Sequence, residues 1–190
     1  MEKTLEGNSL LIGRTASISL GRGLGWGLVG GLAGTVAMDL TLMGVLAAFG
    51  LPALTCFSIV GSTVARFFSM QHVEMAGTIY LGIATHYVVG PVIGTLFGLL
   101  VARVKALNVK TLKKSLLLGI LYVEILSQPL LATTPILLKM TTPAMLQWYA
   151  GSFVMHMIAG AVLGVVVGGG LGLGASRFSS QPSPGGKKDK

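Results

Sequence analysis

Residues 85–100 read THYVVGPVIGTLFGLL, and residues 155–169 read MHMIAGAVLGVVVGG. Both stretches are apolar, both lack charged residues, and in each a histidine is followed by glycine at every fourth position. Such a stretch suits a bilayer, where about 20 apolar residues in a helix cross a hydrocarbon core roughly 30 Å thick. Positions four apart lie on nearly one helix face, so the glycines form a stripe that another helix can approach closely.

The matching stripes predict a duplicated helical hairpin. The stripe glycines, which we expect to serve helix packing, are Gly90, Gly94, Gly98, Gly160, Gly164 and Gly168. An acidic residue precedes each stripe and itself follows a glycine by five positions: Asp39 follows Gly34, and Glu124 follows Gly119. Each half then holds two spans and enters the membrane the same way up, which sets the pseudo-two-fold axis along the membrane normal.

Composition indicates that lipid surrounds the chain. Of its 190 residues, 52% are hydrophobic and only 11% are charged, whereas about a quarter of the residues of a soluble domain are charged. Four apolar stretches are long enough to cross a membrane, at about 24–49, 78–102, 115–138 and 148–172. The predicted fold is therefore all-α, a polytopic four-helix bundle over residues 24–172, because a spanning helix satisfies its own backbone hydrogen bonds.

Lysine and arginine predict the orientation. Most of them lie in the N-terminal segment 1–23, between the second and third spans, and in the tail 173–190. The first loop holds only Arg66 and the third only Lys139. Because positive residues concentrate on the cytoplasmic side, both termini are expected there. The tail, rich in Ser, Pro, Gly and Lys, is expected to be disordered, and the net charge of +8 reflects orientation rather than nucleic-acid binding.

Two segments depart from plain spans. In the first loop, residues 50–77, apolar residues at helical spacing predict a short amphipathic helix in the outer interface; they are Phe57, Val60, Val64 and Phe67. The third span contains Pro129 and Pro135, which are expected to kink or break it.

The layout resembles the YagU-like proteins and related domain-of-unknown-function families, which are small prokaryotic membrane proteins of four spans. The resemblance rests on GLAGTVAMDL, residues 31–40, and on the two stretches quoted above, and it covers roughly residues 24–172. It implies a location in the prokaryotic cytoplasmic (inner) membrane. It implies no established activity and supplies no catalytic residues.

Four ionisable residues fall inside the predicted spans: Asp39, His86, Glu124 and His156. Counted at about 1.5 Å per residue from the cytoplasmic end of each span, Glu124 lies at about 14 Å and the other three at about 22–24 Å. Ionisable groups in a membrane usually face the bundle interior and have a partner. The plain structural interpretation is one Asp–His and one Glu–His hydrogen bond that hold the helices in register.

No complete catalytic or cofactor motif is present, so an enzyme is not expected. The sequence favours a structural or accessory subunit of a larger membrane complex, with other subunits or a second copy as partners. One alternative is a small transporter or proton relay that uses the four ionisable residues. A further alternative is a cofactor: haem b on His86 and His156, or copper on His72, His156, Met155 and Met157. The leading expectation is no cofactor.

Overall fold

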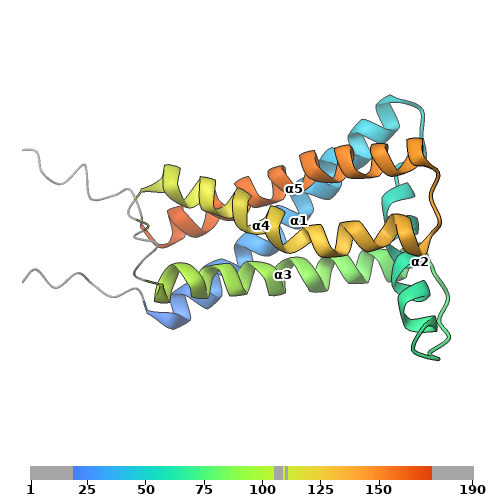
Figure 1. The fold of residues 1–190 in the computed structure, drawn as a ribbon. Coiled ribbons are helices and arrows are strands. Elements are labelled where there is room, and N and C mark those ends of the chain that lie inside the picture. The colour runs from blue at the N-terminus through green and yellow to red at the C-terminus, as the bar shows by residue number, and fades with distance from the viewer. Residues whose placement is uncertain (1–18, 105–108, 110, 173–190) are drawn as a thin grey trace, which may run out of the picture.

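The computed structural model describes residues 19–104, 109 and 111–172, which form helices and their connections (Figure 1). The helices are α1 Leu20–Ala48, α2 Thr55–Ser69, α3 Ile79–Arg103, α4 Leu112–Leu137 and α5 Thr142–Gly170. All except α2 are long and apolar enough to cross a membrane. The prediction of four membrane-length helices in an all-α chain is therefore confirmed. The predictions for residues 1–18 and for the tail 173–190 lie outside the described residues.

Among the long helices, α1, α4 and α5 begin before the apolar stretches that predict them. α1 begins at Leu20 rather than near residue 24, and α5 begins at Thr142 rather than near residue 148. Hydroxyl side chains cap the starts of α1, α3 and α4 by accepting a backbone N–H bond; they belong to Ser19, Thr78 and Thr111. Hydropathy marks the part of a helix that suits lipid, whereas the helix itself continues to its cap.

α1 lies at the centre of the bundle. It packs against both α3 and α5, α4 packs against α5, and α3 and α4 meet only weakly. Figure 1 shows α3, α4 and α5 running back and forth between the two ends of the bundle and α1 crossing them obliquely. α2 lies across one end of them (Figure 1). We call this the α2 end, and we call the opposite end, where α1 starts and α5 finishes, the terminal end.

Aromatic side chains bridge the space between α3 and α4. The ring centroids of Phe97 and Tyr122 are 5.1 Å apart, and the Tyr122 hydroxyl donates to the backbone carbonyl of Ile93 at 3.0 Å. The apolar core continues from these rings to Leu163 and Val167 of α5. Bulky side chains thus separate α3 from α4, while glycines let the other helix pairs come close.

α2 lies where the sequence predicts a helix in the first loop, but its packed face differs from the predicted apolar face. Its buried residues are Phe57, Gly61 and Ala65, whereas Phe67 is exposed. A Cβ on Gly61 would collide with the backbone of Thr78 at the start of α3. Small residues permit this close approach. A prediction based on the spacing of large apolar side chains does not detect them, so it selected a different face of the helix.

α4 continues through both of its prolines, so of the predicted kink or break the break does not occur. Pro135 has no backbone N–H, which leaves the carbonyl of Leu131 without its helical donor. The indole Nε1–H of Trp148, on α5, donates to that carbonyl at 3.1 Å. A neighbouring helix therefore supplies the hydrogen bond that the proline removes.

Candidate functional site

Glycine faces bring the backbones of α1 and α3 into contact. A Cβ built on Gly31 would lie 3.0 Å from the Cα of Gly94 and 3.0 Å from the carbonyl carbon of Gly90. A Cβ on Gly98 would lie 2.9 Å from the Cα of Gly27. Side chains larger than glycine would therefore push the two helices apart along this seam.

A second seam joins α4 to α5. A Cβ on Gly160 would lie 2.7 Å from the carbonyl oxygen of Gly119, and one on Gly164 would lie 2.5 Å from that of Ser115. The Ser115 hydroxyl donates to the carbonyl of Gly164 at 2.8 Å, and Gly168 faces the same serine. Helices that pack through small residues and a hydroxyl are typical of membrane bundles, where burial of apolar surface supplies little driving force.

Asp39 and His86 join α1 to α3 inside the bundle. Asp39 is only 4% exposed, and its Oδ1 lies 2.9 Å from Nδ1 of His86. Because a carboxylate accepts, the imidazole Nδ1–H donates. The second carboxylate oxygen, Oδ2, is buried and has no hydrogen-bond partner within the described ranges.

The start of α2 covers this pair. The ring of Phe57 meets that of His86 edge to face, with centroids 5.3 Å apart. Burial, and to a lesser degree the negative charge of Asp39, together raise the pKa of the neighbouring Cys56 thiol to about 12. The pair is therefore closed from the α2 end by an aromatic ring and a protonated thiol.

Glu124 and His156 do not pair with each other. Glu124 is 9% exposed, and its Oε2 accepts from the side-chain amide of Gln128 at 3.2 Å. The Nδ1–H of His156 donates to the backbone carbonyl of Ser152, one turn earlier on its own helix, at 2.7 Å. The predicted Glu–His hydrogen bond is therefore wrong, whereas the Asp–His bond is present.

The register of the two seams differs from the register that the sequence pattern indicates. Gly31 meets Gly90 in the first seam, and Gly119 meets Gly160 in the second. Gly119 thus packs as Gly31 does. Gly34, which the pattern aligns with Gly119, instead faces α5, where its Cβ would lie 2.7 Å from the carbonyl oxygen of Ala159.

This shift explains why Glu124 misses its histidine. Asp39 lies eight positions after Gly31, and the residue eight positions after Gly119 is Ser127. Glu124 therefore sits nearly one turn closer to the terminal end than a true counterpart of Asp39. Side chains lean toward the start of their own helix, so Glu124 leans toward the terminal end and His156 toward the α2 end.

Both histidines use Nδ1 in the same way and leave the other ring nitrogen unengaged. No hydrogen bond joins Nε2 of His86 or of His156 to another residue that the structure describes. His86 lies within electrostatic range of His156. Three of the four ionisable groups thus lie close to one layer, contributed by α1, α3 and α5.

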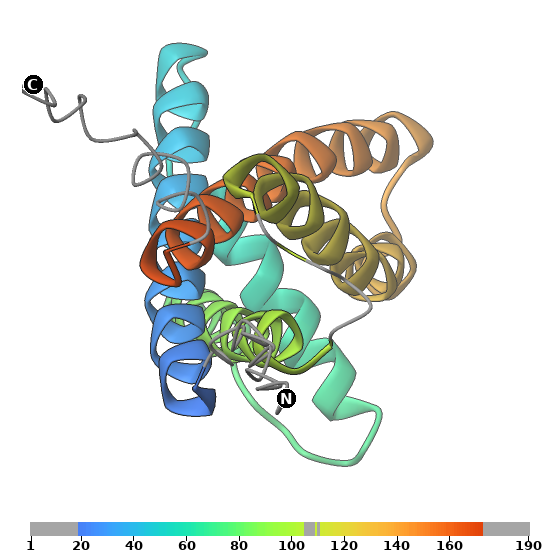
Figure 2. The same cartoon turned by 90° about the vertical axis from the view of Figure 1, so that its left-hand side faces the viewer.

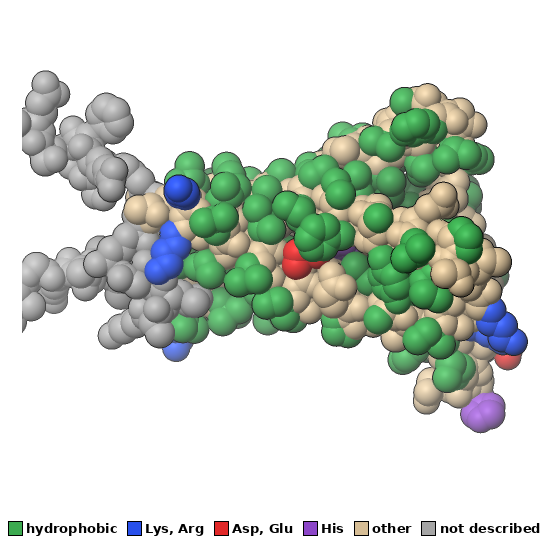
Figure 3. Space-filling model, turned by 45° about the horizontal axis from the view of Figure 1, so that its top comes forward, with side chains coloured by type: hydrophobic (Ala, Val, Ile, Leu, Met, Phe, Trp, Pro, Cys, Tyr) green, Lys and Arg blue, Asp and Glu red, His purple; other side chains and the backbone are tan. Residues whose placement is uncertain are grey.

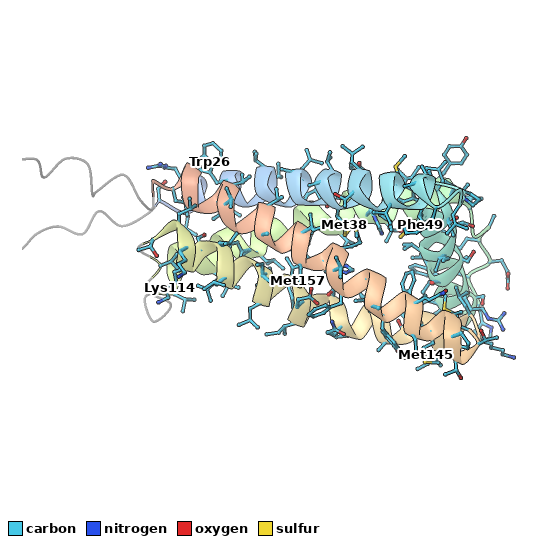
Figure 4. All side chains as sticks on the ribbon, turned by 90° about the horizontal axis from the view of Figure 1, so that it is seen from above. Trp26, Met38, Phe49, Lys114, Met145 and Met157 are labelled. Atoms are coloured by element: carbon cyan, nitrogen blue, oxygen red, sulfur yellow. The ribbon has the colours of Figure 1, made fainter. Side chains whose placement is uncertain are left out.

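The four residues of the copper alternative share no face. Met155 is buried, whereas Met157 is exposed on the outside of α5 (Figure 4), because residues two apart point in different directions on a helix. His72 is exposed beyond the end of α2, with a positive φ of 61°. In the described part of the chain, no group of three or more His, Cys, Asp or Glu is placed to hold a metal ion.

At the terminal end, α1 and α5 make contacts that the sequence pattern does not reveal. The guanidinium of Arg22 donates to the carbonyl of Gly170 at 2.9 Å. The indole of Trp26 occupies the position that a Cβ on Gly170 would take. A cation at the carbonyl end of a helix is stabilising because it meets the negative end of the helix dipole. The sequence gives no indication of this contact, because Arg22 and Gly170 are 148 positions apart and neither belongs to a recognisable motif.

No protein-family model, curated protein or solved structure matches this chain. The resemblance to YagU-like proteins therefore stays a prediction, and function has to be inferred from the geometry.

Proposed function

We propose that this chain is a non-catalytic structural or accessory subunit of a larger membrane complex. Its four long apolar helices fit an integral membrane protein. Hydrophobic side chains cover these helices between two ends at which Lys and Arg side chains gather (Figure 3). The seams described above use backbone contacts between helices, an arrangement suited to a rigid scaffold.

One observation carries the proposal of a partner. The half of α1 nearest the α2 end leans away from the other long helices (Figure 2). On it Leu40 is 63% exposed and Phe49 is 78% exposed, and Gly44 has no atom near its open face. An apolar helix end with an open glycine can receive a helix of another subunit or of a second copy.

A photo-crosslinking experiment tests this proposal. A photoreactive phenylalanine analogue at position 49 or 45 should give an adduct with a protein in native membranes. The same analogue at Leu117 or Leu121, which are exposed on α4, serves as the matched control and should react with lipid alone. Purification in mild detergent should recover the same partner. Lipid adducts at every position, together with a chain that purifies alone, would refute the proposal.

The finer architecture of the bundle belongs to the same proposal. The equivalent contacts of the two seams support a duplicated hairpin, although with Ser127 rather than Glu124 matching Asp39. Charged residues support placing the terminal end in the cytoplasm, with α2 in the outer interface of a prokaryotic cytoplasmic membrane. The residues concerned at the terminal end are Arg22, Arg103, Lys113 and Lys114.

A proton relay is the second candidate function, and the Asp39–His86 hydrogen bond favours it. This bond and the nearby His156 set ionisable groups on three adjacent helices within one layer. Histidine and carboxylates pass protons in membrane transporters. In liposomes, Asp39→Asn should abolish proton flux, while Glu74→Gln, the same kind of change in an exposed loop, should leave it intact. Equal flux in both variants would exclude the relay.

A further inference from the structure

Glu124 is a carboxyl group inside the bundle with too few donors around it. It is 9% exposed, and its one hydrogen bond is the 3.2 Å contact from the neutral amide of Gln128. The other oxygen, Oε1, is buried and has no hydrogen-bond partner among residues 19–104, 109 and 111–172. An ionised carboxylate is costly to bury unless a cation or several donors compensate its charge.

The elements packed against α4 do not supply that cation. The titratable groups on these elements include His156 on α5, His86 on α3 and Cys56 on α2, and none of them donates a hydrogen bond to Glu124. Each imidazole already commits its Nδ1–H elsewhere, and the thiol is held protonated. The positive residues described on α4 and on the helices around it lie toward the helix ends: Arg66, Arg103, Lys113, Lys114 and Lys139.

Asp39 provides the contrast within the same molecule. It is at least as deeply buried as Glu124, yet an imidazole donates to it directly at 2.9 Å. The difference follows from the register of the seams, in which Ser127 rather than Glu124 holds the position equivalent to Asp39. One half of the bundle therefore has a carboxyl with an ionisable partner, and the other half has a carboxyl without one.

We propose that Glu124 is a proton-binding site, occupied at neutral pH. A proton on Oε1 converts the carboxylate into a neutral acid and so removes the buried charge that no cation compensates, while Oε2 still accepts from Gln128. The open side of the site is marked by Gln128, one turn further along α4 and exposed on the surface of the helix. This site is distinct from both functions proposed above, because a chain that conducts no protons can still hold one.

Infrared spectroscopy of the purified full-length chain in detergent tests the proposal. At neutral pH, the wild-type chain should show the C=O stretching band of a protonated carboxyl group. The band should persist in Asp39→Asn and disappear in Glu124→Gln, whose amide imitates the neutral acid in shape and charge. A wild-type chain without the band, or a band lost in Asp39→Asn alone, would overturn the assignment.

A second measurement does not depend on the folding of any variant. Dicyclohexylcarbodiimide, an apolar reagent that adds to protonated carboxyl groups, should modify Glu124 of the wild-type chain. Peptide mass spectrometry should find at least several-fold more adduct at Glu124 than at Asp39, and less adduct as the pH rises. Modification of Asp39 in preference to Glu124 would contradict the proposal. Proton flux in liposomes addresses the relay separately.

Discussion

Replacing Gly164 by alanine should weaken the seam between α4 and α5, and Gly169 offers a control on the same helix. A Cβ at position 164 would lie 2.5 Å from the carbonyl oxygen of Ser115 and 2.7 Å from the Cα of Leu116. These are backbone atoms, so no side chain can swing aside. At Gly169, nothing lies within 4 Å of the new methyl group.

The two substitutions add the same methyl group and both gain helix propensity, up to about 1 kcal/mol in a helix interior and less at Gly169, which lies next to the last residue of α5. At position 164 the helices must separate, and overpacking of this kind costs about 1–3 kcal/mol. The separation also weakens the hydrogen bond from Ser115 to the Gly164 carbonyl, worth about 0.6 kcal/mol in membrane proteins. Gly164→Ala should therefore be less stable than Gly169→Ala by about 2–3 kcal/mol.

Equilibrium unfolding in mixed micelles, with increasing dodecyl sulfate and tryptophan fluorescence as the signal, measures this difference. Gly169→Ala should unfold at or above the wild-type midpoint, and Gly164→Ala well below it. If the two variants unfolded together, the seam would not carry the packing energy assigned to it, and the reasoning from backbone contact would be refuted.

Three further predictions concern hydrogen bonds and the thiol. Asp39→Ala should lower the free energy of unfolding by about 1–3 kcal/mol because it strands the Nδ1–H of His86, and a double-mutant cycle with His86→Leu should recover part of that loss. Trp148→Phe should cost about 0.5–1.5 kcal/mol in the wild-type chain. It should cost less alongside Pro135→Ala, since the alanine N–H then bonds the freed carbonyl; unfolding midpoints check both. With its pKa raised from 9.0 to about 12, the Cys56 thiol should stay protonated at pH about 8–9. Iodoacetamide should then alkylate it more than about tenfold slower than the denatured chain, and rapid labelling of the folded protein would contradict that pKa.

Hydropathy predicted the long helices because lipid places a strict demand on length and composition. A segment such as residues 78–102 must be apolar over its whole span, and that demand is visible in the sequence alone. Hydropathy did not locate the start of α1, where the polar cap Ser19 extends the helix beyond the lipid-compatible stretch. The position of a helix cap depends on local hydrogen bonds and not on hydropathy, so a helix and its apolar stretch can begin at different residues.

The candidate site was predicted in part. The sequence identified Asp39 and His86 as ionisable groups at similar depth, and the structure joins them at 2.9 Å. It could not reveal the bond from Trp148 to the carbonyl of Leu131, or the one from Arg22 to Gly170, because each partner is an ordinary residue until the helices are assembled. Contacts between a side chain and a distant backbone carbonyl leave no pattern in a single sequence.

The misplaced Glu124 shows which residues set the register of this bundle. On a helix, positions three and four apart share a face, so matching Gly119 to Gly34 or to Gly31 is equally consistent with periodicity. Backbone contact between the helices decides between these registers, and only small residues permit that contact. On α4 these small residues are Ser115 and Gly119. The register of the seam then determines the depth of each polar side chain on the helix. In the first seam, the register places Asp39 beside His86. In the second, it places Glu124 nearly one turn away from the position equivalent to Asp39, so two similar acidic residues have different chemical surroundings.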